Sequence, residues 1–417
     1  MNSKYTFIDL FAGCGGLSEG FLASNKFEGL AHVEWELPMV KTLRNRLVNK
    51  WNHSEDDALK RVIHFDIQKT NELLKGSWCK ETTSIFGKTN HKNIVSKGLK
   101  GLIKNRKVDF IIGGPPCQAY SVAGRAQDKN SMKDDYRNYL FESFVKVVQE
   151  FKPKAFVFEN VPGMLSAQPG GVMVTERIYK AFKEIGYEIT NPNNLKERIY
   201  IADDFEVPQK RKRLILVGVK KESNYDLNEI YKSIDSQKSN TKKNVADAIF
   251  NLPKIVPLKS VKKIKGRNVS HIRKEDNTIE ITQHNPRHNN SRDVKIFKKW
   301  VEEKMNSKSS SEKIDFYNKL LNKESKHAKY RNLEWDKPSP TVVAHLYKDG
   351  LMFIHPDSEQ ARTITVREAA LLQAFPADYE FIGSNGYCYK MIGNAVPPLM
   401  AKAIALGINN YFKDITS

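Results

Sequence analysis

One cysteine stands in a sequence setting where its thiol could react. Cys117 directly follows Pro115 and Pro116, at the end of a short apolar run over residues 108–112. The two prolines restrict the loop, so the position of the sulfur is fixed in advance. A nearby N–H group or cation would favour the nucleophilic thiolate. Structural cysteines more often lie inside apolar runs, and an inert buried cysteine is the alternative that these residues leave open.

Acidic and basic side chains accompany two other apolar runs. Glu159 closes one of them, and Arg211 and Arg213 stand at the start of another. Taken singly, such a glutamate is more often solvated, and such a basic run is more often surface. Together with Cys117 at the edge of one sheet, they would combine a nucleophile, an acid and two guanidinium donors, which is a set suited to covalent catalysis.

A glycine-rich turn over residues 9–16 follows the first apolar run. Glycines let a ligand approach the backbone closely, but Ser18 replaces the third glycine of the dinucleotide fingerprint GxGxxG. Glu34 and Asp66 close the next two strand candidates, where they could bond a ribose and an adenine amino group. With Phe11 as an aromatic face, this set suits a nucleoside such as S-adenosylmethionine. The alternative is a tight structural turn with solvated carboxylates.

The elements that must position these groups alternate between strands and helices. Short apolar runs predict buried strands at residues 5–10, 30–34, 62–66, 108–112, 155–158 and 214–219. Helical spacing predicts helices at residues 139–151 and 366–373, and a last helix after Pro398. Buried strands that alternate with helices are typical of an α/β fold with a largely parallel sheet.

The composition limits the class of protein. A chain of 417 residues suits two lobes. The net charge of +20 favours a nucleic-acid partner, although a generic lysine-rich surface is an alternative. The four cysteines form no CxxC pair, so we expect no disulfide framework and no metal site. We find neither a secretory signal nor a run of about 18 apolar residues, and predict a cytoplasmic protein that does not enter a membrane.

Two stretches break the strand–helix pattern. Residues 76–107 are basic and contain several Gly and Asn residues, so we expect them to form a surface excursion. Residues 254–335 are dense in Lys, Asn, Ser and Arg with few apolar runs. This second stretch predicts another lobe with much exposed surface.

Six segments together resemble the DNA cytosine-5 methyltransferase family, in particular its bacterial restriction–modification members. They appear in the order of the family and span nearly the whole chain, which makes the resemblance very specific; one departure is Tyr120, where the family more often has Phe. The segments are FIDLFAGCGG at 7–16, GGPPCQAYS at 113–121, ENVPG at 159–163, QKRKR at 209–213, RTITVREAA with LQAFP at 362–376, and GNAVPP at 393–398.

The resemblance implies a Rossmann-like methyltransferase sheet, a smaller target-recognition domain and S-adenosylmethionine as cofactor. We expect a catalytic and cofactor-binding domain at 1–253, the recognition domain at 254–387, and a return to the large domain at 388–417. The expected cofactor-binding residues are Asp9, Phe11, Gly13, Cys14, Gly15, Gly16, Glu34, Trp35, Asp66, Ile67, Pro115, Asn394 and Val396.

The implied reaction is methylation of cytosine C5 in a specific duplex DNA sequence. Cys117 would add to C6, Glu159 would hold a proton at N3, and Arg211 and Arg213 would hold O2 and neighbouring phosphate. The base must be flipped out of the helix to be reached. We expect Gln118 and Ser121 to contact the DNA. Asn394 either positions the cysteine loop or belongs to a simple turn.

Several alternatives stay open beside this hypothesis. A related enzyme acts on a tRNA cytosine, although the long segment 254–387 argues against it, and a silent DNA-binding protein could use the same scaffold. We expect a monomer that protects DNA from a cognate restriction endonuclease. The target sequence is not encoded in any simple pattern. The polar residues His284, Arg287, His288, Arg292 and Asp293 could read bases, but packing or phosphate contact is the favoured interpretation.

Overall fold

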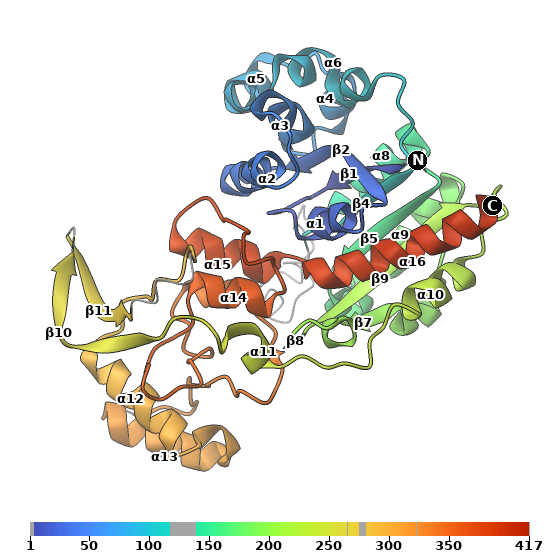
Figure 1. Cartoon of the computed structure of the whole chain (residues 1–417). Coiled ribbons are helices and arrows are strands. Elements are labelled where there is room, and N and C mark those ends of the chain that lie inside the picture. Colours follow the sequence, from blue (N-terminus) through green and yellow to red (C-terminus); the bar gives the residue numbers. More distant parts are fainter. Residues whose placement is uncertain (1–3, 117–138, 265, 275–280, 323, 417) are drawn as a thin grey trace. The chain divides into compact units, whose positions relative to one another are not determined.

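The chain folds into two compact units, which we describe from a computed structural model (Figure 1). The structure describes residues 4–116, 139–264, 266–274, 281–322 and 324–416. Unit 1 comprises Met1–Phe205, Lys212–Asn240 and Ala395–Ser417, and unit 2 comprises Glu206–Arg211 and Thr241–Asn394. The chain enters unit 2 twice, first at Glu206 for six residues and again at Thr241, and the predicted domain limits at 253/254 and 387/388 stay predictions.

Unit 1 is built on an eight-stranded sheet with the order β3-β2-β1-β4-β5-β9-β6, and β7 also pairs with β9. The pairs from β3 to β5 are parallel, and β9 runs antiparallel to β5, β6 and β7. The strands are β1 (Tyr5–Leu10), β2 (Phe27–Glu34), β3 (Val62–His64), β4 (Phe110–Gly113), β5 (Ala155–Asn160), β6 (Tyr187–Ile189), β7 (Ile199–Ile201) and β9 (Lys212–Lys220). The prediction of an α/β fold with a largely parallel sheet is confirmed.

Apolar side chains cover both faces of this sheet because residues alternate along each strand. On one face the rings contact each other in series, Phe7 with Phe21, Phe21 with Phe27 and Phe27 with Phe110, and the ring of Phe412 lies 5.2 Å from that of Phe110. Helices of both layers are visible in Figure 1. They are α1 (Gly16–Ala23), α2 (Leu37–Asn49), α3 (Glu55–Arg61), α4 (Thr70–Lys75), α5 (Lys80–Phe86), α6 (Lys92–Ile103), α8 (Leu140–Phe151), α9 (Val174–Glu184), α10 (Leu227–Asp235) and α16 (Pro398–Thr416).

The prediction of a surface excursion at residues 76–107 is wrong. This segment forms α5 and α6, and it contributes Trp78, Phe86, Ile94 and Leu99 to the buried core on the other face of the sheet. The Trp78 ring lies 4.5 Å from that of Phe65, just after β3. Apolar residues are sparse among the lysines of this segment, but these four are buried.

Unit 2 is a smaller assembly of helices, short strands and one long hairpin. A cluster that includes Phe297, Trp300 and Tyr330 forms one of its cores. Its elements are β8 (Gln209–Lys210), α11 (Val245–Ile249), β10 (Ile255–Ile264), β11 (Arg267–Arg273), α12 (Ser291–Glu302), α13 (Ser310–Leu321), β12 (Ser339–Pro340), α14 (Val366–Leu372) and α15 (Asn385–Asn394).

A buried ion pair organises the end of unit 2. Arg362 donates from its two terminal nitrogens to the two carboxylate oxygens of Glu368, at 2.7 and 2.6 Å. Glu368 also accepts from the N–H of Thr365, whose hydroxyl caps α14. Both members of the pair are sealed from solvent.

One stretch of the described chain passes a test for membrane-spanning helices by length and composition alone. It is Asn385–Ile415, and 67% of its apolar window is buried inside the protein. A core helix of a globular fold meets the same criterion.

Candidate active site

The parallel register brings the sequence-predicted groups of unit 1 to one edge of the sheet. Glu34 pairs with His64, Val33 pairs with Leu10, and Leu10 pairs with Gly113. Gly113 in turn pairs with Phe158. The carboxyl ends of β3, β2, β1, β4 and β5 therefore lie side by side, which is where open α/β sheets bind ligands.

The glycine turn after β1 is held by a carboxylate from β2. Gly13 and Gly15 have φ angles of 57° and 90°, in the left-handed region that favours glycine. The N–H of Gly13 donates to Oε2 of Glu34 at 2.8 Å. A side chain at Gly13 would point into open space. The turn is thus fixed by Glu34 while its outer side stays accessible to a ligand.

Glu34 is buried, and its carboxylate accepts hydrogen bonds from several backbone N–H groups. Its Oε1 accepts from the N–H groups of Trp35 and Glu36, at 2.9 and 2.8 Å. Burial raises the pKa of Glu34 to about 7, although the backbone N–H groups oppose that shift. The neighbouring Trp35 is 55% exposed, which is unusual for so large an apolar ring. Three N–H donors leave lone pairs on this carboxylate for a hydroxyl group, and Trp35 offers an aromatic surface beside it.

Asp9 lies beneath the turn, inside the protein. Its Oδ2 accepts from the Ser18 hydroxyl at 2.5 Å, and that hydroxyl also lies 2.8 Å from Nδ1 of His32. Burial raises the pKa of Asp9 to about 8 and lowers that of His32 to about 3. The structure therefore places Asp9 in a buried network that joins β1, α1 and β2, and its contact with a cofactor stays a prediction.

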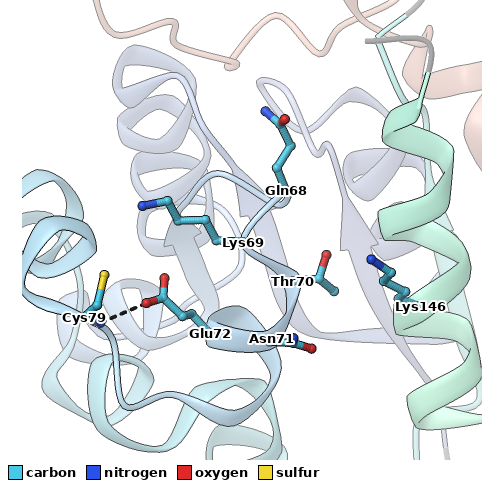
Figure 2. Close-up of a pocket in the computed structure, with 7 residues that line it drawn as sticks. All are labelled: Gln68, Lys69, Thr70, Asn71, Glu72, Cys79 and Lys146. Carbon is cyan, nitrogen blue, oxygen red and sulfur yellow. Dashed lines mark hydrogen bonds between the residues drawn. The ribbon is translucent and has the colours of Figure 1, made fainter. Parts of the chain in front are cut away.

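The third strand end carries Asp66 in a half-buried turn, where it accepts from the N–H of Gln68 at 3.0 Å. Ile67 is buried. A cavity of about 330 Å³ is lined by residues that follow Ile67 in the sequence (Figure 2). At this cavity, Glu72 accepts from the N–H of Cys79 at 2.9 Å. The cavity is lined by Gln68, Lys69, Thr70, Asn71, Glu72, Cys79 and Lys146. Asp66 and Ile67 border this cavity in sequence but do not line it.

The remaining predicted cofactor residues lie at different depths. Cys14 is buried, and Phe11 is half-buried with a φ of 59° and packs against the core. Gly16 stands so close to the backbone oxygen of Val396 that a Cβ would not fit. The structure thus brings Val396 to the glycine turn. Asn394 ends α15 in unit 2, and its side chain is exposed.

The second predicted turn, after β4, is described as far as residue 116. Pro115 is buried, and its carbonyl accepts from Nδ2 of Asn160 at 3.3 Å. Asn160 was not predicted, although its place next to Glu159 at the end of an apolar strand is the signal that marks it. Cys117, Gln118 and Ser121 lie outside the described residues, so their predicted roles stay predictions.

Glu159 meets Arg213 at this edge. The two residues are diagonal neighbours on β5 and β9, since Glu159 pairs with Ile215 in register. Nε of Arg213 lies 2.5 Å from Oε1 of Glu159, and the side chains are 10% and 12% exposed. A Cβ at Gly114 would lie so close to Oε2 of Glu159 that a side chain there would displace the carboxylate. An acid and a guanidinium are thus held together directly beside the Pro115 turn.

Arg211 has a different place from Arg213. It is buried in unit 2, where its terminal nitrogens donate to the carbonyls of Val342 at 2.8 Å and Gly393 at 2.9 Å. These bonds tie three chain segments of unit 2 together. The predicted contact of Arg211 with a substrate is not tested by this geometry, but both of its terminal nitrogens already bond main-chain oxygens.

The family model for C-5 cytosine-specific DNA methylases matches residues 5–99 and 79–410. The chain belongs to the C-5 cytosine-specific DNA methylases. The type II methyltransferase M.Bpa9945I of Bacillus paralicheniformis is 34% identical, with 97% of this chain and 98% of the relative covered. M1.HphI of Haemophilus parahaemolyticus is 32% identical over 96% of this chain and 85% of its own length.

A solved structure agrees with the fold. It is that of a candidate DNA modification methyltransferase encoded within an E. coli prophage, with a TM-score of 0.63 and 23% identity, covering 98% of this chain and 100% of that one. This DNA methylase therefore has the Rossmann-like sheet of S-adenosylmethionine-dependent methyltransferases. The predicted family, fold class and enzyme class, a DNA cytosine-5 methyltransferase of the restriction–modification type, are confirmed.

Proposed function

We propose that this DNA methylase methylates C5 of a flipped-out cytosine in a specific duplex sequence, through a covalent bond between Cys117 and C6. The observation that carries the proposal is the pairing of Glu159 with Arg213 at 2.5 Å, at the edge that also carries the Pro115 turn. Cytosine C5 is a poor nucleophile until a thiolate adds to C6. The proposed reaction therefore needs an acid near the cysteine, and Glu159 lies beside Gly114, three residues before Cys117 in the sequence.

The proposed reaction begins with an addition and ends with an elimination. The Cys117 sulfur bonds to C6, the C5–C6 double bond opens, and the electron pair becomes available at C5 while Glu159 holds a proton at N3. Arg213 holds Glu159 in place and neutralises charge that develops at O2. The cofactor would supply the methyl group to C5 from its sulfonium, whose sulfur would keep the electron pair of the broken bond. The C5 proton then leaves to a base and the C5–C6 double bond re-forms. The C6–S bond breaks with its electron pair returning to the Cys117 sulfur, and Glu159 keeps the N3 proton.

The residues at the neighbouring strand ends fit S-adenosylmethionine. Glu34 has lone pairs left for a ribose hydroxyl, Trp35 presents an exposed ring, and Gly13 leaves its outer side open. Asp66 would take the adenine amino group, and Phe11 and Val396 would border the cofactor. The bound cofactor would supply an electrophilic methyl group. The acid and thiol then only have to raise the electron density at C5.

We also propose a protective role in a cytoplasmic restriction–modification system, with double-stranded DNA as partner and a monomeric enzyme. The type II methyltransferases among the relatives support this role. A tRNA substrate is not favoured, since the named relatives and the family model are DNA methylases. A cognate endonuclease belongs to the proposal through the family alone.

Covalent trapping tests the proposal. Sequencing of host DNA after expression gives the methylated position, and a duplex with 5-fluorocytosine at that position is then incubated with protein and cofactor. Fluorine blocks the final elimination, so we expect a stable protein–DNA adduct with the natural chain and none with Cys117→Ser, which should still bind DNA. Absence of an adduct and of new 5-methylcytosine would overturn the proposal, and preferential methylation of tRNA would overturn the substrate.

A further inference from the structure

The hairpin formed by β10 and β11 in unit 2 is strongly basic. Residues 255–274 contain seven cations and no acidic residue. The described lysines of its outer half, Lys259, Lys262 and Lys263, are exposed, and none of them forms an ion pair with another described residue. Figure 1 shows the hairpin extending away from the helices of unit 2.

The base of the hairpin is fixed. Ile255 is buried, and its N–H donates to Oε1 of Gln360 at 3.0 Å. His271 is buried on the paired strand, and its Nε2 lies 3.3 Å from the carbonyl of Ala361. The N–H of Asn289 donates to Ser270 at 2.9 Å. The outer half is therefore carried on a rigid support, which lowers the entropic cost of binding through it.

A bulge separates the base from the outer half. Pro257 pairs with His271 and Lys262 pairs with Val269, so four residues of β10 stand opposite one residue of β11. Bulges bend a strand and redirect its side chains. The outer half thus forms a short ribbon of its own, and the bulge allows this ribbon to point in a different direction from the base.

The outer ribbon carries cations on both faces. Successive residues point to opposite faces of a strand, so Lys262 and its partner Val269 share one face, and Lys263 and its partner Asn268 share the other. Three residue pairs extend about 10 Å along the strands, close to the groove depth of about 8.5 Å. A duplex groove has phosphates on both walls and admits a two-stranded ribbon. Cations on both faces match that arrangement.

The other polar cluster of unit 2 is already occupied by internal contacts. His284 is buried between the Thr365 hydroxyl and the carbonyl of Pro253, at 3.1 and 2.9 Å. Arg287 donates to the carbonyl of Leu346 and stacks over a tyrosine ring. For these two residues the packing interpretation is confirmed. They are not available for DNA as the lysines of the hairpin are.

We propose that the outer half of the β10–β11 hairpin enters a groove of the DNA duplex, where Lys259, Lys262 and Lys263 bind phosphates of both strands. The inference rests on the proposed DNA substrate and names the structural element that binds its phosphates. Lysine–phosphate contacts carry no sequence information directly. The hairpin therefore sets affinity and the register of unit 2 on the duplex, while base reading falls to other groups.

The test is the salt dependence of DNA binding by the full chain. The variant K259Q/K262Q/K263Q is compared with K295Q/K299Q/K319Q, which removes the same charge from exposed positions of α12 and α13. Affinity for a random-sequence duplex is measured by fluorescence anisotropy over a series of NaCl concentrations. Each phosphate contact that is lost lowers the slope of log K against log[salt] by about 0.9. We expect the magnitude of the slope to fall by about 2 to 3 in the hairpin variant and by less than about 0.9, the equivalent of one contact, in the control.

Two further readouts keep the outcome interpretable. Thermal unfolding and S-adenosylmethionine affinity should be unchanged in both variants, since all six lysines are exposed and far in sequence from the cofactor edge. An unchanged slope in the hairpin variant, or an equal fall in the control, overturns the hairpin proposal while the natural chain still methylates DNA. Failure of the proposed function is a separate result, because the natural chain would then neither methylate nor be trapped.

Discussion

The two units each contain an arginine–glutamate pair, and the pairs differ in almost every physical respect. In unit 2, Arg362 and Glu368 are joined by two bonds, a helix cap adds a third donor, and the side chains are 0% and 1% exposed. In unit 1, Arg213 and Glu159 meet through Nε and Oε1, and both are slightly exposed at the sheet edge. The first pair is sealed into a fold, whereas the second lies where a substrate can reach it.

This difference distinguishes a structural pair from a chemical one. The Arg362–Glu368 pair is sealed from solvent, and both carboxylate oxygens of Glu368 already accept from Arg362, so this pair has little left to offer a ligand. In the proposed mechanism, a pair at a strand end would exchange its partner for an incoming base. Glu159→Gln and Glu368→Gln test this distinction, and each variant serves as the control for the other.

The largest expected effect is on the rate of Glu159→Gln. The amide cannot deliver a proton to N3, so we expect methyl transfer to fall by about 10²- to 10⁴-fold. Cofactor affinity should stay close to that of the natural chain. The loss of unfolding free energy should be smaller than for Glu368→Gln, because Arg213 and Glu159 are 10% and 12% exposed and water can screen the charge that remains. Single-turnover transfer of labelled methyl groups measures the rate. A rate within a few-fold of the natural chain would remove Glu159 from the mechanism.

Glu368→Gln should act on stability instead. It leaves the charge of Arg362 buried without its counter-ion, which costs about 3–5 kcal/mol of unfolding free energy. Urea denaturation followed by circular dichroism measures the loss. The rate per folded molecule should change little at low temperature. If the rate falls as steeply as in Glu159→Gln while stability is retained, the assignment of the two pairs is inverted.

Opposite pH responses are expected for the two units. Burial raises the pKa of Asp9 to about 8, so its contribution to stability is present below its ordinary value of 3.8 and is lost as pH rises through 8. Burial alone would also raise the pKa of Glu368, but the charge of Arg362 outweighs it and holds that pKa well below 4.5. The stability from Glu368 is therefore present above pH 4.5 and is lost as pH falls.

Asp9→Asn sharpens that contrast. An amide does not titrate, so the variant should lose less stability between pH 6 and 9 than the natural chain, by up to about 1.4 kcal/mol per pH unit. Glu34, with a pKa of about 7, keeps part of the alkaline loss in both proteins. Urea titrations at a series of pH values provide the comparison. An identical alkaline loss in the two proteins would show that Asp9 does not titrate in this range.

The smallest effect concerns two exposed aromatic side chains, one in each unit. Trp35 is 55% exposed at the cofactor edge, and Phe250 is 65% exposed in unit 2. Stacking on a base is worth about 1–3 kcal/mol, so Trp35→Ala should weaken S-adenosylmethionine binding by about 5- to 150-fold. Phe250→Ala should leave that affinity unchanged. Isothermal titration calorimetry would contradict the assignment if the two variants bound the cofactor equally well.

Much of the cofactor and catalytic edge could be predicted, because strand ends are visible in a sequence. Apolar runs located β1, β5 and β9 closely, and parallel strands necessarily bring Glu34 and Glu159 to one edge. What failed depends on three-dimensional packing. The apolar residues around Trp78 are too widely spaced among lysines to indicate a buried segment. The run QKRKR likewise gives no sign that Arg213 meets Glu159 while Arg211 bonds carbonyls in unit 2.

The order in which the chain visits the two units constrains how the protein is made. Unit 1 contains α16, whose Phe412 joins the ring cluster on one face of the sheet, so it needs residues that come before and after unit 2 in the sequence. During synthesis, one face of the sheet stays incompletely covered until unit 2 has been translated, because α16 follows unit 2 in the sequence. Since domains generally fold as units during synthesis, a partly made chain has no complete catalytic unit. The sheet of unit 1 can therefore be completely covered only after α16 has left the ribosome.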